Sequence, residues 1–329
     1  MSLRPIGGKP LRPIGLGCMS LAHGYGVPPS PEDGARVLRA ALDLGYDHFD
    51  TARLYGAGRS ETLIGETLKG ERQRIYLASK MGIIIEGTSR RIDCKPATIR
   101  AEVEKSLTAL QTDHIDLYYM HRRDFDTPIE DSVGAFADLI AEGKIGAIGL
   151  SEMSAETLRR AHATHPIAAM QTEYSPWTRN VEIAVLETTR ELGVALVAFS
   201  PVARGVLADA LHDPATLRAD DIRYAMPRFN AENWPANRAL AEAFNALAAE
   251  QGVTPAQLSL AWVLSRGDHV HAIPGTARLD HLAENKARED WVPDAAVIAR
   301  IDALINQGTV RGHRYATAMQ RTIDTEEFA

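Results

Sequence analysis

The sequence has 329 residues and a mass of 35.9 kDa, of which 45% are hydrophobic and 24% charged. This length accommodates two average domains or one α/β barrel, and the composition is that of a globular protein with a large core. The net charge is −7 with lysine and arginine dispersed, which argues against nucleic-acid or anionic-membrane partners. The sequence has only two cysteines, and it shows neither the apolar core of a signal peptide nor an apolar membrane span. These features predict a cytoplasmic protein.

Eight short runs with strand character recur along the chain. Each is an apolar run, and most are separated from the next by a helical pattern. The predicted strands cover residues 13–19, 48–52, 74–80, 115–121, 147–152, 168–175, 195–201 and 271–276.

Helical patterns lie between most of these runs. Residues 96–110 repeat apolar side chains at intervals of three and four, which predicts an amphipathic helix. Two other predicted helices begin after a capping residue, which is Ser30 before a proline in one and Thr254 before Pro-Ala-Gln in the other. The predicted helices cover residues 31–44, 96–110, 130–142, 155–163, 181–192, 237–250 and 255–265.

Eight strands alternating with helices predict a parallel sheet, and eight is the number that closes a (β/α)₈ TIM barrel. An open doubly wound sheet is the alternative, but the segment GAGRSE at 56–61 lacks the third glycine of a dinucleotide-binding turn. We expect a single domain over 1–329, with the barrel over about 10–290. The long loop 202–234 and the C-terminal segment 291–329 are predicted to cover one barrel mouth.

Polar side chains stand at the expected C-terminal ends of the strands, where the loops of a barrel form one concave face. Tyr55 follows the second strand on a glycine-containing turn. Taken singly, such residues are most often caps, solvated charges or structural histidines. Their occurrence on successive strands is what indicates a site, and they are Asp50, Lys80, His121, Ser151, Glu152 and Gln171.

This set of residues suits proton transfer from a phenol. A tyrosine with a pKa near 10 is a poor acid at neutral pH, and a nearby ammonium group stabilises the phenolate. We expect Lys80 to lie beside Tyr55 and Asp50 to pair with Lys80, while His121 orients the oxygen that is protonated. Such a tyrosine is a general acid for a carbonyl that receives a hydride, and the hydride must come from a cofactor.

At this point the sequence resembles a known family. The segments FDTARLYGAGRSETLIGETL, IDLYYMHRRDFDTPIED, GKIGAIGLSEMS, QTEYSPWTR, AFSPVARGVL and IPGTARLDHLAEN, with the strand that ends at Lys80, occur in the order typical of aldo-keto reductases. The resemblance covers about residues 10–290 and is strongest to the bacterial and plant branch with Ser-Glu after the fifth strand. It implies a (β/α)₈ barrel that binds extended NADPH without a Rossmann domain.

The resemblance implies that Tyr55 is the proton donor, that Asp50 and Lys80 tune it, and that His121 orients the carbonyl. It also implies a cofactor site that runs from the nicotinamide to the adenosine. The implied contacts are Ser151, Glu152, Gln171 and Phe199 for the nicotinamide, Ser200, Pro201 and Arg204 for the pyrophosphate region, and Gly275, Thr276, Arg278, His281, Glu284 and Asn285 for the adenosine and its 2′-phosphate.

Three positions depart from the pattern of many family members. Glu152 replaces an asparagine, and an ionised carboxylate cannot donate to the carboxamide oxygen. Phe199 replaces a tyrosine and keeps the aromatic face for stacking. His281 replaces an arginine and offers less charge to a 2′-phosphate, so we expect NADPH as the cofactor with NADH as the alternative.

The function predicted from these residues is NADPH-dependent reduction of an aldehyde or ketone, with a small-molecule carbonyl compound as partner. One alternative is a cofactor-sensing binding subunit, like the related barrels that serve as potassium-channel auxiliary subunits. Another is a Schiff-base lyase that uses Lys80, which the carboxylate of Asp50 disfavours because it keeps the amine charged. A metal hydrolase lacks three ligands at recognisable spacing.

The physiological substrate, the direction of the reaction and the oligomeric state are left open by the sequence. Loop residues near the barrel mouth are expected to line the substrate pocket. These are His23, Tyr25, Arg122, Phe125, Tyr224 and Trp234, together with Arg311, His313 and Tyr315 from the C-terminal segment.

Overall fold

Eight parallel strands form the centre of the molecule, whose computed structural model describes residues 3–87, 89–210 and 213–328. The ends of the expected domain, residues 1–2 and 329, lie outside these ranges. The strands are β3 (Leu16–Gly17), β4 (His48–Asp50), β5 (Tyr76–Met81), β8 (Leu117–Met120), β9 (Ile148–Ser151), β10 (Ile167–Glu173), β11 (Ala195–Phe199) and β12 (Val270–Ala272). Each of the eight predicted runs overlaps one of them.

The sheet closes on itself. The strands are hydrogen-bonded in chain order from β3 to β12, all in parallel. Parallel bridges then join Ile14 to Ala272 and Gly17 to Gly275, and the amide of Gly15 donates to the oxygen of Ala272 at 2.9 Å. The first and last strands are therefore neighbours, and the fold is the predicted (β/α)₈ barrel rather than an open sheet.

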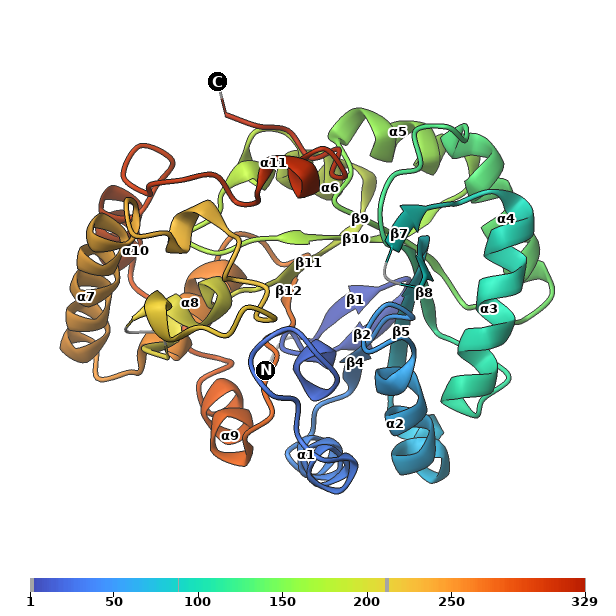
Figure 1. The fold of residues 1–329 in the computed structure, drawn as a ribbon, viewed down its shortest axis with the longest axis horizontal. Coiled ribbons are helices and arrows are strands. Elements are labelled where there is room, and N and C mark those ends of the chain that lie inside the picture. The colour runs from blue at the N-terminus through green and yellow to red at the C-terminus, as the bar shows by residue number, and fades with distance from the viewer. Residues whose placement is uncertain (1–2, 88, 211–212, 329) are drawn as a thin grey trace.

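Helices surround the strands as a ring (Figure 1). They are α1 (Pro31–Asp43), α2 (Arg59–Leu68), α3 (Pro96–Leu110), α4 (Ile129–Ala141), α5 (Ala155–Thr164), α6 (Val185–Leu192), α7 (Trp234–Glu250), α8 (Pro255–Leu264), α9 (Leu279–Ala287), α10 (Ala295–Leu304) and α11 (Thr317–Gln320). No helix within the described ranges is long and apolar enough to cross a membrane.

Relative to the sequence prediction, the structure adds helices and moves the starts of α6 and α7 by several residues. Helix α2 opens directly after the loop that carries Tyr55, and α9, α10 and α11 follow the barrel. Helix α6 starts at Val185 because residues 180–182 form a 3₁₀ turn. Helix α7 starts at Trp234, since a proline fits the first turn of a helix, where its missing N–H is not needed.

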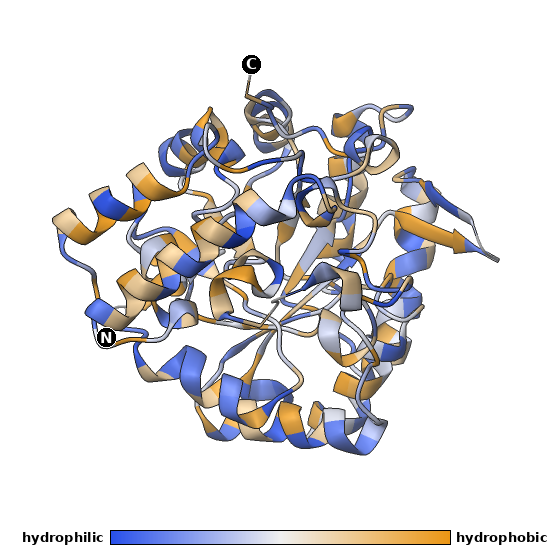
Figure 2. Ribbon diagram, turned by 60° about the vertical axis from the view of Figure 1, so that its left-hand side comes forward, coloured by the Kyte–Doolittle hydropathy of each residue, from blue (hydrophilic) through white to orange (hydrophobic). Residues whose placement is uncertain are grey.

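Two hairpins were not predicted. The first, β1 (Arg4–Ile6) with β2 (Lys9–Leu11), places Ile6 and Leu11 in the cluster that fills the barrel interior. The second, β6 (Ile83–Glu86) with β7 (Ser89–Ile92), follows β5 at the other end of the barrel. Figure 2 shows it standing away from the helices, with one hydrophobic and one hydrophilic strand.

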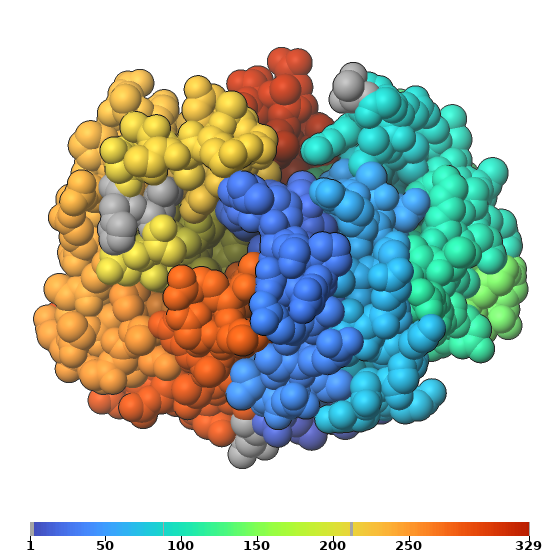
Figure 3. Space-filling model, turned by 60° about the horizontal axis from the view of Figure 1, so that its bottom comes forward, coloured from blue at the N-terminus to red at the C-terminus, as the bar shows by residue number. Residues whose placement is uncertain are grey.

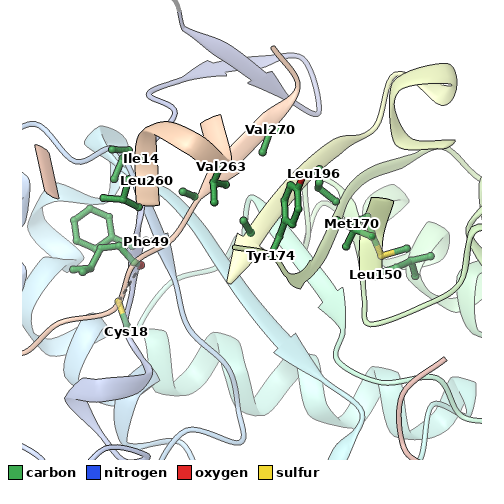
Figure 4. Close-up of a cluster of buried hydrophobic side chains, with 14 of the residues drawn as sticks. Ile14, Cys18, Phe49, Leu150, Met170, Tyr174, Leu196, Leu260, Val263 and Val270 are labelled. Carbon is green, nitrogen blue, oxygen red and sulfur yellow. Dashed lines mark hydrogen bonds between the residues drawn. The ribbon is translucent and has the colours of Figure 1, made fainter. Parts of the chain in front are cut away.

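Side chains alternate along each strand between two cores. The outward core fills the space between strands and helices and includes Phe49, Leu150 and Met170 (Figure 4). The inward core contains Ala78 and Tyr119, and all of these side chains are fully buried. Because alternation continues to the strand ends, each strand's last inward residue faces the barrel mouth.

Glycine at position 149 makes room inside the barrel. Gly149 pairs with Tyr119 across β8 and β9, and a methyl group at Gly149 would lie 2.2 Å from Cδ1 of that tyrosine ring. The ring is fully buried, so it has no free volume in which to move.

We predict that Gly149→Ala lowers the free energy of unfolding by about 1–3 kcal/mol because it overpacks the barrel interior. Urea unfolding followed by circular dichroism measures the change. The control is Gly134→Ala in α4, where an added Cβ meets nothing within 4 Å. That variant is expected to gain about 0.4–1 kcal/mol. A wild-type midpoint for Gly149→Ala would contradict this account of the interior.

Candidate active site

The inward positions at the C-terminal strand ends bring the predicted polar residues together. Asp50 follows His48 at an inward position of β4, Lys80 follows Ala78 on β5, and Gln171 follows Ala169 on β10. The same alternation places His121, Ser151 and Phe199 around one mouth of the barrel, and Tyr55 reaches it from the turn after β4. All four line a single cavity with Asp50 and Gln171.

Lys80 is the centre of this group. Its ammonium is fully buried and pairs with the carboxylate of Asp50. Its Nζ also donates to the backbone oxygen of Thr51 at 2.7 Å and lies 3.4 Å from the hydroxyl of Tyr55. The other oxygen of Asp50 accepts from Nε2 of Gln171 at 2.8 Å, so one carboxylate orients both the amine and the amide.

A backbone hydrogen bond and two glycines shape the turn that carries Tyr55. The amide of Tyr55 donates to the oxygen of Ala52 at 3.0 Å, and the turn continues through Gly56 and Gly58, which have φ of +62° and +94°. A Cβ at Gly58 would lie 1.9 Å from a guanidinium nitrogen of Arg53. The flexible Arg53 side chain can move, but a φ of +94° at Gly58 favours glycine where the chain passes from Tyr55 into α2.

The pKa values of Tyr55 and Lys80 differ from the expectation that the ammonium simply lowers the pKa of the phenol. Burial raises the pKa of Tyr55, and the ammonium of Lys80 opposes that effect without reversing it. For Lys80, burial favours the neutral amine, but the charges of Asp50 and Tyr55 outweigh it and raise the pKa. The free protein therefore holds a protonated phenol against a permanently charged amine.

Two histidines flank the phenol. The rings of His121 and His23 lie 6.0 and 5.6 Å from the ring of Tyr55. Burial, with help from Arg122 and Lys80, lowers the pKa of His121 well below its usual value. Burial and nearby arginines lower the pKa of His23 to about 4. Both imidazoles are therefore neutral at physiological pH and can donate one hydrogen bond each.

The cavity at this mouth has a volume of about 720 Å³. It extends from the group around Tyr55, past the loop after β11, to the segment 275–285 after β12. Figure 3 shows the surface hollowed between the N-terminal part of the chain, the loop after β11 and the segment after β12. Its length suits an extended ligand rather than a compact one.

The loop after β11 has a strained backbone where it borders the cavity. Ser200, Ala203 and Arg204 have φ of +49°, +50° and +58°, a region that costs about 1–3 kcal/mol for a residue with a side chain. Such strain gathers at ligand sites, and alternating right- and left-handed residues point successive N–H groups toward anions. Ser200, Pro201 and Arg204 all line the cavity, as expected.

The segment after β12 lines the far end of the cavity. Thr276 accepts from the amide of Arg278 at 3.0 Å, and its hydroxyl lies 3.4 Å from Nδ1 of His281. The side chain of Arg278 is exposed and forms an ion pair with Asp280. The remaining predicted residues, Gly275, Glu284 and Asn285, line the same end.

Glu152 is a correction to the sequence prediction. It was expected beside the nicotinamide but is not among the residues that line the cavity. It lies just beyond β9 and has a left-handed φ of +54°. Its carboxylate is fully buried, with an ion pair to Arg314 at 2.7 Å and a bond from the hydroxyl of Thr325 at 3.0 Å. The residue binds the C-terminal segment instead.

Arg314 connects Glu152 to a second buried carboxylate. Its guanidinium lies 3.4 Å from Glu173, which also pairs with Arg204 at 2.7 Å, and Arg204 donates to the hydroxyl of Tyr315 at 3.0 Å. Although burial opposes it, the two arginines lower the pKa of Glu173 to about 2. This cluster fastens the C-terminal segment to the ends of β9 and β10.

The expected substrate-pocket residues divide into two groups. His23, Tyr25, Arg122 and Tyr315 line the cavity, whereas Phe125 and Tyr224 are exposed and Trp234 is buried against Phe229. Arg311 and His313 are exposed and lie outside the lining. Sequence reasoning missed the hairpin residues Ile83, Arg90 and Ile92, and from the C-terminal segment Ala318, Met319 and Thr322. The polar turn EGTS between two isoleucine-bearing runs was the signal for the hairpin.

Comparisons with known proteins agree with this geometry. The model of the aldo/keto reductase family matches residues 13–306. The chain belongs to the aldo/keto reductase family. It is 40% identical to the aldo-keto reductase str7 of Strobilurus tenacellus over 99% of this chain and 98% of that protein.

Solved structures of the family have the same fold. A glycerol dehydrogenase from Gluconobacter oxydans superposes with a TM-score of 0.84 at 27% identity, covering 99% of this chain and 98% of that one. An aldo/keto reductase from Klebsiella pneumoniae, solved in complex with NADP and acetate, gives a TM-score of 0.73 at 27% identity, with coverages of 96% and 99%.

We predict that Arg314→Met costs about 3–5 kcal/mol of unfolding free energy, because it leaves buried carboxylates without their partner. The folded pKa of Glu173 lies below its usual value of 4.5, so its pairing stabilises the protein above that pH and is lost as the pH falls toward 2. Loss of Arg314 should therefore shift acid unfolding to higher pH. Urea midpoints measured from pH 3 to 8 test both effects.

The matched control is Arg321→Met, an exposed arginine of the same segment. A surface substitution there should change stability by less than about 0.5 kcal/mol. Equal effects of the two substitutions would mean that the buried cluster does not hold the segment.

Proposed function

We propose that the protein reduces the carbonyl group of an aldehyde or ketone to an alcohol with NADPH, and that Tyr55 donates the proton. The observation that carries the proposal is the placement of the Tyr55 hydroxyl 3.4 Å from a buried ammonium that Asp50 keeps charged. A phenolate formed at Tyr55 would be stabilised at once by Lys80, which lowers the barrier to giving up the proton.

The residues of the cavity fit a nicotinamide dinucleotide. Ser151, Gln171 and Phe199 would hold the nicotinamide end, and the left-handed backbone from Ser200 to Arg204 suits the pyrophosphate. Arg278 would supply charge to a 2′-phosphate, since its present ion pair with Asp280 is exposed and therefore weak. Thr276, His281, Glu284 and Asn285 would surround the adenosine. When bound, the reduced nicotinamide supplies a hydride to the carbonyl carbon.

Three side chains and Tyr55 would control the transfer of the proton to the carbonyl oxygen. Neutral His121 donates a hydrogen bond to the carbonyl oxygen and orients it toward the hydroxyl of Tyr55. As negative charge develops on that oxygen, the phenol transfers its proton, and Lys80 stabilises the resulting phenolate. Asp50 holds the amine in place and keeps it charged.

The same electrostatics argue against a Schiff-base lyase. Such a mechanism needs a neutral lysine as nucleophile, whereas the pKa of Lys80 is raised by Asp50 and Tyr55 despite burial. A metal-dependent reaction has no candidate within the described residues, which contain no group of three potential ligands.

We predict that Tyr55→Phe lowers kcat by about 10²- to 10⁴-fold, because it removes the general acid while keeping the ring. The decrease in NADPH absorbance with a panel of aldehydes and ketones measures turnover. Quenching of protein fluorescence measures NADPH binding, which should stay within about twofold of wild type. Turnover near the wild-type rate with this variant would rule out Tyr55 as the donor.

We also predict that Lys80→Met and Tyr55→Phe are strongly non-additive. When two residues act as one catalytic unit, the first substitution removes most of the rate enhancement and the second lowers the rate little further. The double variant should therefore be no more than about tenfold slower than Tyr55→Phe alone. Multiplication of the two single effects would show that the residues act independently.

A further inference from the structure

Two arginines in the cavity have no carboxylate partner among the residues that the structure describes. Arg122 directly follows His121, and its Nη1 donates to the oxygen of His121 at 2.7 Å and approaches Oγ of Ser151 at 3.5 Å. Arg90 lies on β7 of the projecting hairpin and is exposed at the rim. Both side chains line the same cavity as Tyr55.

Each of the other cavity-lining arginines forms an ion pair with a nearby acid. Arg91, the neighbour of Arg90, pairs with Glu86 and Asp93. The remaining pairs are Arg204 with Glu173, Arg223 with Asp221, and Arg278 with Asp280. Glu152 lies within electrostatic reach of Arg122, but its oxygens bind Arg314 and other groups of the C-terminal cluster. Arg90 and Arg122 are thus positive charges available to a ligand.

Both charges lie at the catalytic end of the cavity. Arg122 is sequence-adjacent to His121 and lowers the pKa of that histidine, second to burial. After burial, Arg90 has the largest effect on His23, whose ring lies 5.6 Å from that of Tyr55. The residues that suit the cofactor phosphates belong to other elements, the loop after β11 and the segment after β12.

The acids of the cavity do not offset these charges. Among the described lining residues the carboxylates are Asp50, which is paired with Lys80, and Glu284 at the far end. The lining of the same cavity also includes the apolar residues Ile83, Met19 and Leu54. The catalytic end therefore combines an apolar wall with two unpaired guanidinium groups, which suits a ligand that has an apolar body and an anionic group.

We propose that the carbonyl substrate carries an anionic group, a carboxylate or a phosphate, which Arg122 and Arg90 bind while the carbonyl lies at Tyr55. The inference rests on the proposed reductase function and specifies its substrate class. Guanidinium groups match both anions in geometry and charge, and a charge-assisted bond is stronger at a partly buried site than at an exposed one. Arg122, which is half-buried, contributes more than Arg90.

The test compares aldehydes that differ only in the anionic group. One pair is 4-carboxybenzaldehyde and its neutral amide 4-carbamoylbenzaldehyde, which have similar shapes, and the second is glyceraldehyde 3-phosphate and glyceraldehyde. We expect kcat/KM to favour the anionic member of at least one pair by about tenfold or more, corresponding to one charged hydrogen bond. The pair with the larger ratio identifies carboxylate or phosphate as the recognised group.

Substitutions assign the preference to the two residues. Arg122→Gln should lower kcat/KM for the anionic aldehyde by about 10- to 100-fold and for its neutral partner by less than about threefold. Arg90→Gln should lower the same ratio by up to about fivefold, as expected for an exposed charge. Arg91→Gln is the matched control on the same strand, and because its charge is already paired it should leave the ratio unchanged.

A binding measurement keeps the test independent of turnover. Calorimetry of the NADP⁺-loaded protein with benzoate should show tighter binding than with benzamide, and Arg122→Gln should abolish the difference. Equal kcat/KM within both aldehyde pairs together with equal binding of benzoate and benzamide would overturn the proposal. So would a loss in Arg122→Gln that affects NADPH and neutral aldehydes equally. Failure of all aldehydes to be reduced, with the benzoate preference intact, would instead overturn the reductase function.

Discussion

A single buried charge governs the arrangement of this barrel mouth. The ammonium of Lys80 lies where no water reaches it, and a cation in such a place is tolerated only with partners that satisfy it. Asp50, the backbone oxygen of Thr51 and the hydroxyl of Tyr55 are those partners. One amine therefore links β5 to the end of β4, to the turn after β4 and to the phenol. Chemistry and stability depend on the same contacts here.

The sequence predicted the architecture well because the barrel repeats one simple rule. Eight apolar runs separated by helical patterns define the closed sheet, and alternation along each strand decides which residues face the interior. Asp50, Lys80 and Gln171 could be placed at the mouth for that reason alone. Glu152 lies beyond the reach of this rule, because β9 ends at Ser151 and Glu152 has a left-handed φ of +54°.

What the sequence did not reveal depends on contacts between distant segments. The ion pair between Glu152 and Arg314 joins residues 162 positions apart, and no local pattern announces it. The exposure of Phe125 and Tyr224 and the burial of Trp234 were likewise decided by how the long loops pack. The pKa of Tyr55 is a further case. Sequence reasoning included the nearby ammonium but could not weigh it against burial of the phenol, which has the larger effect on the pKa.

The hairpin β6–β7 has a consequence for how such an enzyme changes over evolutionary time. Its strands pair with each other and form no part of the eight-stranded ladder, so within the described chain its sequence is not constrained by barrel closure. Yet it carries Ile83, Arg90 and Ile92 to the cavity wall. Exchange of ten contiguous residues, 83–92, can therefore alter ligand preference while the scaffold is conserved. Diversification by loop grafting requires that the residues that select the ligand, here in the hairpin, are separate from those that form the barrel.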